Sequence, residues 1–378
     1  MLPPMPEDEL RCALVLHRTS GIGPVLYKEL MAHFGTAEAV LAAAPSLRPR
    51  GRLTAAILAS LTAPTWSAVD ADIAWGARPG YAVMELRDPR YPYRLAQIPD
   101  PPPILFVRGD CAILNRRQIA IVGSRNPSTT GRDTARMLAR DLAAQGVVIT
   151  SGLAYGIDSA GHEGALEAEN GVTVAVAATG LDRVYPPQHR ELAHRILERG
   201  ALVSEYPPGT APLAAHFLRR NRIISGLSLG TLVVEAALDS GSLTTAQCAL
   251  DQNRDVFSVP GSIYNPLARG CHALLRQGAF LVETSQDILR HITPHGTGTT
   301  VGSVIKTEDS LDSDYQKLLA CFGYDPVPID ALVEQSGLTP AVVSSMLTIL
   351  ELRGLVVGQP GGLYTRATST PPTLGRNI

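Results

Sequence analysis

The sequence predicts an α/β protein built around a doubly wound parallel sheet, and two observations support this fold class. Short β-branched segments recur about every 25–30 residues from residue 119 onward. They are IAIVG at 119, VVITSG at 147, TVAVAATG at 173, ALVSEY at 201, TLVVEAA at 231, DVFSVPG at 255 and AFLVET at 279. Amphipathic stretches such as GRDTARMLARDLAAQG lie between them, with apolar residues at three- and four-residue steps. Nearly continuous apolar strands alternating with helices are typical of a parallel sheet covered on both faces, expected here within residues 86–292.

The region before this domain, residues 1–85, is expected to be helical because Ala and Leu recur at helical spacing from residue 7 to about 75. Within it, SGIGPVLYKELMAHFGTAEAVL predicts three helices separated by glycine turns. Gly21-Ile22-Gly23-Pro24 resembles the hairpin of helix-hairpin-helix modules, whose backbone N–H groups can face a phosphate. A plain helix–helix connection is the alternative. The Pro-rich stretch at 86–104 cannot form a continuous helix and is expected to be a connector.

The chain after the α/β domain changes character twice. Residues 293–310 are a polar Gly/Thr-rich linker, and residues 367–378 are expected to be a disordered tail. Between them, residues 311–366 predict a winged helix, with two short helices joined at Ser336-Gly337 and a small hairpin. This segment has six acidic and three basic side chains, so we expect a protein–protein or regulatory module.

Composition limits the function classes. No apolar run reaches the roughly 18–20 residues of a membrane span, and MLPPMPEDEL lacks the features of a signal peptide, so we expect a cytoplasmic protein without membrane contact. Five widely spaced cysteines predict reduced thiols and no metal site: Cys12, Cys111, Cys248, Cys271 and Cys321. The net charge is −2, whereas nucleic-acid-binding proteins are usually basic, so any DNA site must concentrate its positive charge locally.

The first predicted strand ends in Gly123, Ser124 and Arg125, and a helix is expected to begin near Thr129. Ligands of open α/β sheets bind beyond the carboxyl ends of the strands. A glycine turn at a helix N-terminus offers N–H groups to an anion, and the hydroxyl and guanidinium add further phosphate contacts. A purely structural turn is the alternative. Neither G-x-G-x-x-G nor G-x-x-x-x-G-K-[ST] is present, so no nucleotide cofactor is expected.

The second strand leads into a loop with Gly152, Tyr155 and Gly156, where the glycines allow close approach of the backbone to a ligand. Asp158 follows, and we expect it to cap the next helix rather than to act in catalysis. His162, four residues on, is expected to lie within hydrogen-bond reach of Asp158 or the neighbouring loop.

Two later loops add candidate positions. Gly180 follows the third strand. Glu235 ends the strand that opens at Gly230-Thr231, and Ser242 lies where Ser240 to Thr245 predict another loop-to-helix start.

The densest cationic cluster combines arginines with an aromatic ring, and its members are Phe217, Arg219, Arg220, Asn221 and Arg222. Arginines that bind phosphates beside a ring that stacks on a base suit a single strand of nucleic acid. A solvated helix face is the alternative, but the cluster leads directly into a buried strand, so part of it is expected to face the cleft.

The motifs IAIVGSR, SGLAYGIDSAGH, RRNRIISGLS, VVEAALDSGSLTTA, VFSVPGSI and GCHALLRQGA closely resemble the DprA (Smf) family of DNA-processing proteins over about residues 85 to 290. The resemblance implies an extended Rossmann-like domain flanked by a SAM-like helical domain and a DML1-like winged helix. It also implies a non-enzymatic homodimer, formed through the Rossmann-like domain, that binds and protects single-stranded DNA without sequence preference. Loading of RecA recombinase during natural transformation is implied too. By the same resemblance, residues 123–125 and 217–222 bind the strand.

Two positions depart from the family pattern. Tyr155 stands where a basic residue is usual, and Leu218 stands where a proline is usual. Tyr155 removes a phosphate contact and offers a stacking surface, so we expect weaker salt dependence than in relatives with the basic residue.

Two other function classes compete with this interpretation. Gly230-Thr231 followed by a buried run to Glu235 resembles the Rossmann-like nucleotide phosphoribohydrolases, in which a glutamate assists cleavage of an N-glycosidic bond. The other competing class is a scaffold that recruits recombinase without binding DNA.

Overall fold

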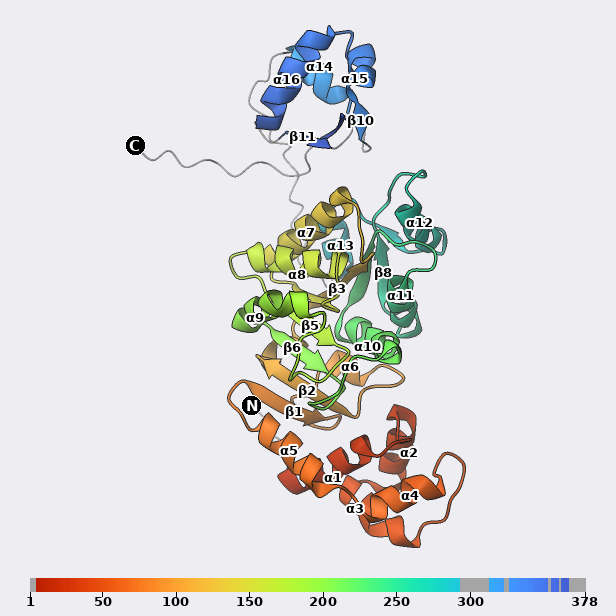
Figure 1. The fold of residues 1–378 in the computed structure, drawn as a ribbon. Coiled ribbons are helices and arrows are strands. Elements are labelled where there is room, and N and C mark those ends of the chain that lie inside the picture. Colours follow the sequence, from red (N-terminus) through yellow and green to blue (C-terminus); the bar gives the residue numbers. More distant parts are fainter. Residues whose placement is uncertain (1–4, 293–312, 323–325, 353–354, 360–361, 367–378) are drawn as a thin grey trace, which may run out of the picture. The chain divides into compact units, whose positions relative to one another are not determined.

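The computed structural model describes residues 5–292, 313–322, 326–352, 355–359 and 362–366, which fall into two units (Figure 1). The first unit contains nearly all of residues 5–292, and the second contains the C-terminal domain. The expected linker at 293–310 and the expected tail at 367–378 lie outside the described residues.

In the described part of the first unit, nine strands form one sheet in the order β1-β2-β6-β5-β4-β3-β7-β8-β9. The strands are β1 (Tyr81–Glu85), β2 (Ile104–Gly109), β3 (Gln118–Gly123), β4 (Val148–Ser151), β5 (Thr173–Ala177), β6 (Ala201–Ser204), β7 (Gly230–Val234), β8 (Asp255–Ser258) and β9 (Phe280–Leu281). Neighbours from β6 through β9 are parallel, which confirms the predicted parallel sheet and all of its predicted strands. The last strand is shorter than AFLVET suggests, because β9 pairs with β8 only through its two residues.

The strand order contains one topological switch. From β3 the chain adds β4, β5 and β6 on one side, then returns to place β7 on the other side of β3, followed by β8 and β9. Loops leaving β3 and β7 therefore diverge at the carboxyl edge of the sheet, which is where open α/β sheets bind their ligands.

Alternating side chains of each strand fill the two faces of the sheet. Ile119 and Ile121 of β3 belong to an apolar cluster with α7 and α8, whereas Ala120 and Val122 belong to the cluster on the other face, with α10 and α11. The helices of this domain are α6 (Tyr93–Ala96), α7 (Thr129–Ala144), α8 (Ile157–Glu167), α9 (Arg190–Arg199), α10 (Ala214–Leu227), α11 (Gly241–Asp251), α12 (Arg269–Arg276) and α13 (Ser285–Ile292). The period of two in the strands thus buries both faces, as the sequence predicts for a doubly wound sheet.

Two antiparallel strands extend the sheet beyond the predicted set. β1 pairs with β2, and β2 pairs with β6, both antiparallel. The boundary predicted between residues 85 and 86 falls between these two paired strands. The Pro-rich connector between them contains only the short α6, and it brings the two strands together.

The N-terminal domain is a set of helices: α1 (Glu7–Arg18), α2 (Pro24–Phe34), α3 (Ala37–Ala43), α4 (Ala55–Thr62) and α5 (Trp66–Gly76). Glycine turns join the first three of them, as predicted. Gly21 and Gly35 have φ of 94° and 81°, a conformation that side chains disfavour. The helices pack on the sheet through a shared apolar cluster that includes Phe106. Tyr27 of α2 also donates a hydrogen bond to Glu85 of β1 at 2.8 Å.

The second unit has the elements of the predicted winged helix. They are α14 (Ser313–Ala320), α15 (Ile329–Ser336), α16 (Pro340–Leu352) and a three-stranded sheet in the order β10-β12-β11, formed by Val327–Pro328, Leu363–Arg366 and Val356–Gln359. Gly337 ends α15 with φ of 67°, a left-handed C-cap. Leu332, Val343 and Leu347 are fully or almost fully buried in a core of its own.

Candidate nucleic-acid interface

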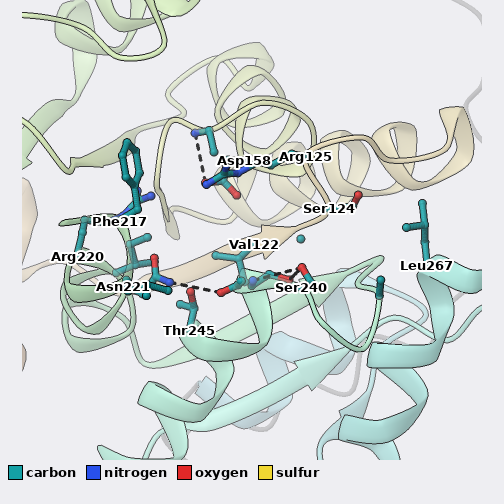
Figure 2. Close-up of a pocket in the computed structure, with 17 residues that line it drawn as sticks. Val122, Ser124, Arg125, Asp158, Phe217, Arg220, Asn221, Ser240, Thr245 and Leu267 are labelled. Carbon is teal, nitrogen blue, oxygen red and sulfur yellow. Dashed lines mark hydrogen bonds between the residues drawn. The ribbon is translucent and has the colours of Figure 1, made fainter. Parts of the chain in front are cut away.

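A cavity of about 410 Å³ opens at the β3/β7 switch (Figure 2). Loops after β3, β4 and β7 and one side of α10 line it, and we call it the switch cavity. In Figure 2, Phe217, Arg220 and Asn221 lie together on the α10 side, with Ser240 and Thr245 from the α11 end of the cavity. Segments more than 100 residues apart in the sequence therefore meet at one site.

The loop after β3 contributes Gly123, Ser124 and Arg125 to the cavity lining. Gly123 approaches β7 so closely that a Cβ there would lie 2.0 Å from the carbonyl oxygen of Val234. Ser124 N–H donates to the carbonyl of Glu235 at 2.7 Å, which fixes the loop against the end of β7. Arg125 is exposed, and its guanidinium carbon lies 6.0 Å from the centroid of the Phe217 ring. This loop thus holds a cation at the mouth of the cavity.

The N-terminus of α7 already has an anion, and that anion is a side chain of the protein. Glu235, with φ of 51°, accepts hydrogen bonds from Ser128 N–H at 2.8 Å and from Ser128 Oγ at 2.6 Å. Ser128 caps the helix through Gly131 N–H, and a Cβ at Gly131 would lie 2.4 Å from the Glu235 carboxylate. The sequence predicted that this helix end faces a phosphate. The prediction is corrected because the carboxylate from β7 occupies the place where the partial positive charge of the helix is greatest.

The N-terminus of α11 lies on the cavity instead. Ser240 is its N-cap and accepts a hydrogen bond from Ser242 N–H at 3.3 Å. Gly241, Ser242 and Thr245 line the cavity, so the first turn of α11 presents small polar residues and the positive end of a helix dipole to it.

Arg220 is the buried cation of the site. Its side chain is 4% exposed, Nη1 donates to the carbonyl of Val176 at 2.7 Å, and Nε is buried without a hydrogen-bond partner among the described residues. Burial lowers its pKa to about 10, while the nearby Asp158 opposes the shift, so the guanidinium stays charged at neutral pH. Gly152 makes room for it, since a Cβ at residue 152 would lie 1.8 Å from Nη1. The glycine in the loop after β4 therefore leaves the space that the Arg220 guanidinium of α10 occupies.

Asp158 and His162 take different partners from those the sequence predicted. Gly156, not Asp158, is the N-cap of α8, and Asp158 accepts hydrogen bonds from Gly152 N–H at 3.0 Å and Ala154 N–H at 3.4 Å. Burial raises the pKa of Asp158, although Arg220 and these N–H groups counteract the rise. His162 Nδ1 lies 2.7 Å from Thr173 Oγ on β5 rather than bonding Asp158. The Asp158 carboxylate therefore stabilises the loop between β4 and α8 instead of the helix end.

Two arginines of the predicted cationic cluster pair with a carboxylate that the sequence analysis did not single out. Arg222 bonds to Glu205 through both terminal nitrogens, at 2.9 and 2.8 Å, and to Asp100 through Nε at 2.9 Å. Arg219 donates to the same Glu205 at 2.9 Å and keeps 44% of its side chain exposed. The arginines lower the pKa of Glu205, although its burial acts in the opposite direction. The cluster is therefore much less positive than its sequence suggests.

Glu205 could have been found from the sequence, because it directly follows the strand at 201–204, where ligand- and ion-binding residues of parallel sheets collect. Phe217 packs against the Tyr185 ring, with the centroids 5.4 Å apart. No local pattern in the sequence predicts this contact.

The remaining predicted residues divide between the cavity and its surroundings. Asn221 lines the cavity and donates from Nδ2 to the carbonyl of Gly241 at 3.4 Å. Tyr155 is 41% exposed beside the cavity, next to Gly156, where a Cβ would meet the Ser124 carbonyl at 2.3 Å. Gly180 lies apart from the lining and packs against the backbone of Pro207 and Pro208.

None of the helices in the described ranges is both long and apolar enough to traverse a bilayer.

Family comparisons cover all three domains. Residues 82–293 match the DNA recombination-mediator protein A family, residues 306–362 match the DprA winged helix domain, and residues 7–63 match the DprA-like N-terminal HHH domain. The N-terminal match confirms the predicted helix-hairpin-helix character of this region.

Curated relatives and solved structures agree with these matches. Protein Smf of Escherichia coli is 42% identical over 305 residues, which are 79% of this chain and 80% of the relative. The X-ray structure of DNA processing protein A from Streptococcus pneumoniae superposes with a TM-score of 0.65 at 32% identity, over 78% of this chain and 100% of that one. DNA processing protein A of Helicobacter pylori, solved to study its single-stranded DNA binding mode, has a TM-score of 0.51 at 30% identity, over 56% of this chain and 94% of that one. With one family match across more than half of the chain and a relative aligned over four fifths of its length, this chain belongs to the DNA recombination-mediator protein A family, also named DprA or Smf.

Proposed function

We propose that this protein binds single-stranded DNA through its phosphates at the switch cavity, without preference for sequence. The observation that carries the proposal is the convergence of three phosphate-binding features on one cavity: exposed Arg125, buried Arg220 and the N-terminus of α11. Guanidinium groups and helix N-termini both bind phosphate oxygens, and contacts of this kind carry no sequence information.

A single strand fits the site better than a duplex does. Phe217 lines the same cavity as Arg125, so an aromatic ring lies beside the proposed phosphate site, and unpaired bases can stack on such rings. The single-stranded DNA binding mode for which the Helicobacter pylori relative was studied supports the same choice.

The proposed interface depends on few charges. Arg219 and Arg222 are paired with Glu205, so they add little net positive charge. If Arg125 and Arg220 are the two cations that meet phosphates, the slope of log affinity against log salt is about −1.4 per site, because each single-strand contact contributes about −0.7.

The test is the variant Arg125→Ala, measured by fluorescence anisotropy with a labelled oligo-dT at 50 and 200 mM salt. We expect the Kd at the lower salt to rise about tenfold and the salt slope to lose about 0.7 in magnitude, since one phosphate contact is removed. Arg140→Ala is the matched control, because Arg140 is an exposed arginine of α7 that pairs with Asp141.

An unchanged Kd for Arg125→Ala would refute the proposal that Arg125 binds a phosphate. If the unaltered protein does not bind oligo-dT, the scaffold hypothesis is favoured, in which the protein recruits recombinase without contacting DNA.

We further propose that the protein forms a homodimer through its Rossmann-like domain, protects incoming strands and loads RecA recombinase on them during natural transformation. Membership of a family of recombination mediators supports this role. The measurement is the rate of RecA filament formation on single strands with and without the protein; no acceleration would refute loading.

Hydrolysis of an N-glycosidic bond is not proposed. The carboxylate that this reaction would need at the end of β7, Glu235, is already hydrogen-bonded to Ser128 N–H and Oγ at the N-terminus of α7. A general acid has to reach the leaving group, and this one is engaged in holding a helix end.

A further inference from the structure

The segment from Tyr185 to His189 carries aromatic contacts to two sides of the switch cavity. At its start, the Tyr185 ring packs on Phe217 with centroids 5.4 Å apart and an interplanar angle of 57°. At its end, His189 packs edge-on against Tyr155, with centroids 4.9 Å apart and an angle of 70°. Tyr155 Oη also donates a hydrogen bond to Gln188, so its ring is anchored to this segment by two contacts.

Arg125 contacts the partners of this segment on two sides. The Arg125 guanidinium lies over the Phe217 ring, 6.0 Å from its centroid. On the other side, the Arg125 backbone touches Gly156 so closely that a Cβ there would lie 2.7 Å from the Arg125 carbonyl. Tyr155 is the residue before Gly156. The proposed phosphate-binding arginine is therefore linked to both tyrosines, through Phe217 on one side and through the backbone on the other.

Exposure decides which rings can accept a base. Phe217 is partly buried, with Arg125 over its ring and Tyr185 against it. Tyr185 is 45% exposed and Tyr155 is 41% exposed, although each has one aromatic contact that fixes its position. The open aromatic surface beside the cavity thus belongs to the tyrosines, and Phe217 acts as a support for Tyr185.

We propose that Tyr185 and Tyr155 form a nucleobase-stacking subsite beside the switch cavity, which takes unpaired bases of the strand whose phosphate lies at Arg125. This inference rests on the proposed binding of single-stranded DNA and adds the side chains that meet the bases. Stacking on a tyrosine is tolerant of sequence, because every base has a π face. An aromatic subsite also explains how a cavity whose lining contains two arginines, Arg125 and Arg220, holds a strand.

The experiment compares two ligands that share phosphates and differ in bases. Binding of oligo-dT and of an abasic strand of equal length is measured by anisotropy for the unaltered protein, Tyr185→Leu and Tyr185→Phe. We expect Tyr185→Leu to raise the Kd for oligo-dT about tenfold and to leave the Kd for the abasic strand within about twofold, because only the stacking is lost. Tyr185→Phe keeps the ring and should restore the oligo-dT Kd to within about twofold.

Tyr93→Leu is the matched control, since Tyr93 is a 64% exposed tyrosine on α6, away from the cavity lining. A 2-aminopurine placed in the oligonucleotide gives a direct signature: its fluorescence should be quenched on binding and regain intensity with Tyr185→Leu. A loss of affinity for both strands equally, or for neither, would overturn the subsite.

The two proposals fail differently. If the unaltered protein binds oligo-dT and the abasic strand with equal affinity, phosphate binding stands and the stacking subsite is refuted. If it binds neither strand, both proposals are refuted.

Discussion

Among single residues, Arg220 has a guanidinium that is 4% exposed and a hydrogen bond from Nη1 to the carbonyl of Val176. A buried charge is costly unless nearby groups compensate it, and here the Asp158 carboxylate and the Val176 carbonyl provide that compensation. Gly152 leaves space for the Arg220 guanidinium because it has no side chain. The position of this cation against the cavity therefore depends on three other residues, from the loop after β4, from β5 and from the start of α8.

Gly152→Ala is expected to displace Arg220, because the new Cβ would lie 1.8 Å from Nη1 in the present arrangement. Breaking a hydrogen bond to a charged group and leaving it buried costs about 1.5–3 kcal/mol, so the free energy of unfolding should fall by about 2 kcal/mol. Denaturant unfolding measures this loss, and anisotropy should show weaker oligo-dT binding. Gly23→Ala is the control, since a Cβ at residue 23 meets nothing within 4 Å. Equal stability of the two variants would contradict the role given to Gly152.

At the scale of elements, side chains from one strand or helix repeatedly satisfy the polar groups of another. Glu235, directly after β7, accepts hydrogen bonds at the N-terminus of α7, and Glu205, directly after β6, binds the arginines of α10. His162 of α8 lies against Thr173 of β5, whose hydroxyl donates to the Ile149 carbonyl of β4 at 2.6 Å. Since that hydroxyl donates its proton to Ile149, it accepts one from Nδ1, so Nδ1 of His162 carries a proton.

The buried histidine predicts a pH dependence of stability. Burial lowers the pKa of His162 to about 3, with His189 and Arg220 acting in the same direction. Below about pH 6.5 the unfolded chain binds a proton here that the folded chain does not, so stability falls as the pH is lowered toward the folded pKa. The free energy of unfolding should therefore drop by roughly 2 kcal/mol between pH 7 and pH 5 on this account.

The check is denaturant unfolding at both pH values for the unaltered protein and His162→Gln. The variant lacks the titrating group and should lose less stability over this interval. Glu205 does not interfere, because its pKa is lowered and its contribution is lost only as the pH falls below the usual carboxylate range. Equal losses in the two proteins would show that His162 does not account for the effect.

On the scale of the whole molecule, the positive charge is balanced by acidic residues and is carried almost entirely by arginine. The only lysines in the sequence are Lys28, Lys306 and Lys317, so every phosphate contact in the α/β domain has to come from arginine, a helix end or a neutral donor. Arginine binds phosphate with two parallel hydrogen bonds and also stacks on aromatic rings. A near-neutral domain can therefore hold a strand by geometry and stacking where a basic one would rely on long-range attraction.

Removal of the chain after Ile292 is expected to leave oligo-dT binding within about threefold. The winged helix has six acidic and three basic side chains in residues 311–366, so it offers little attraction to a phosphate backbone. Anisotropy with the truncated and full-length proteins measures the difference. A Kd more than tenfold higher for the truncated chain would mean that the winged helix contacts the strand directly.

The sequence by itself determined the α/β class, the parallel strands, the glycine turns and the edge of the sheet at which the site lies. Each of these follows from local patterns: a period of two or 3.6 residues, a turn residue, or the position just after a strand. Local patterns also predict binding positions at Gly123, Ser124, Arg125, Arg220 and Ser242, and all of these line one cavity in the structure.

Only the tertiary structure decided which charges remain available there. Glu235 reaches Ser128 across 107 residues, and Arg222 reaches Asp100 across 122. The β3/β7 switch brings together loops that are far apart in the sequence, so the partner of each charged group depends on the assembled sheet. For the same reason, the contact between Tyr185, in the segment after β5, and Phe217 of α10 depends on the tertiary structure.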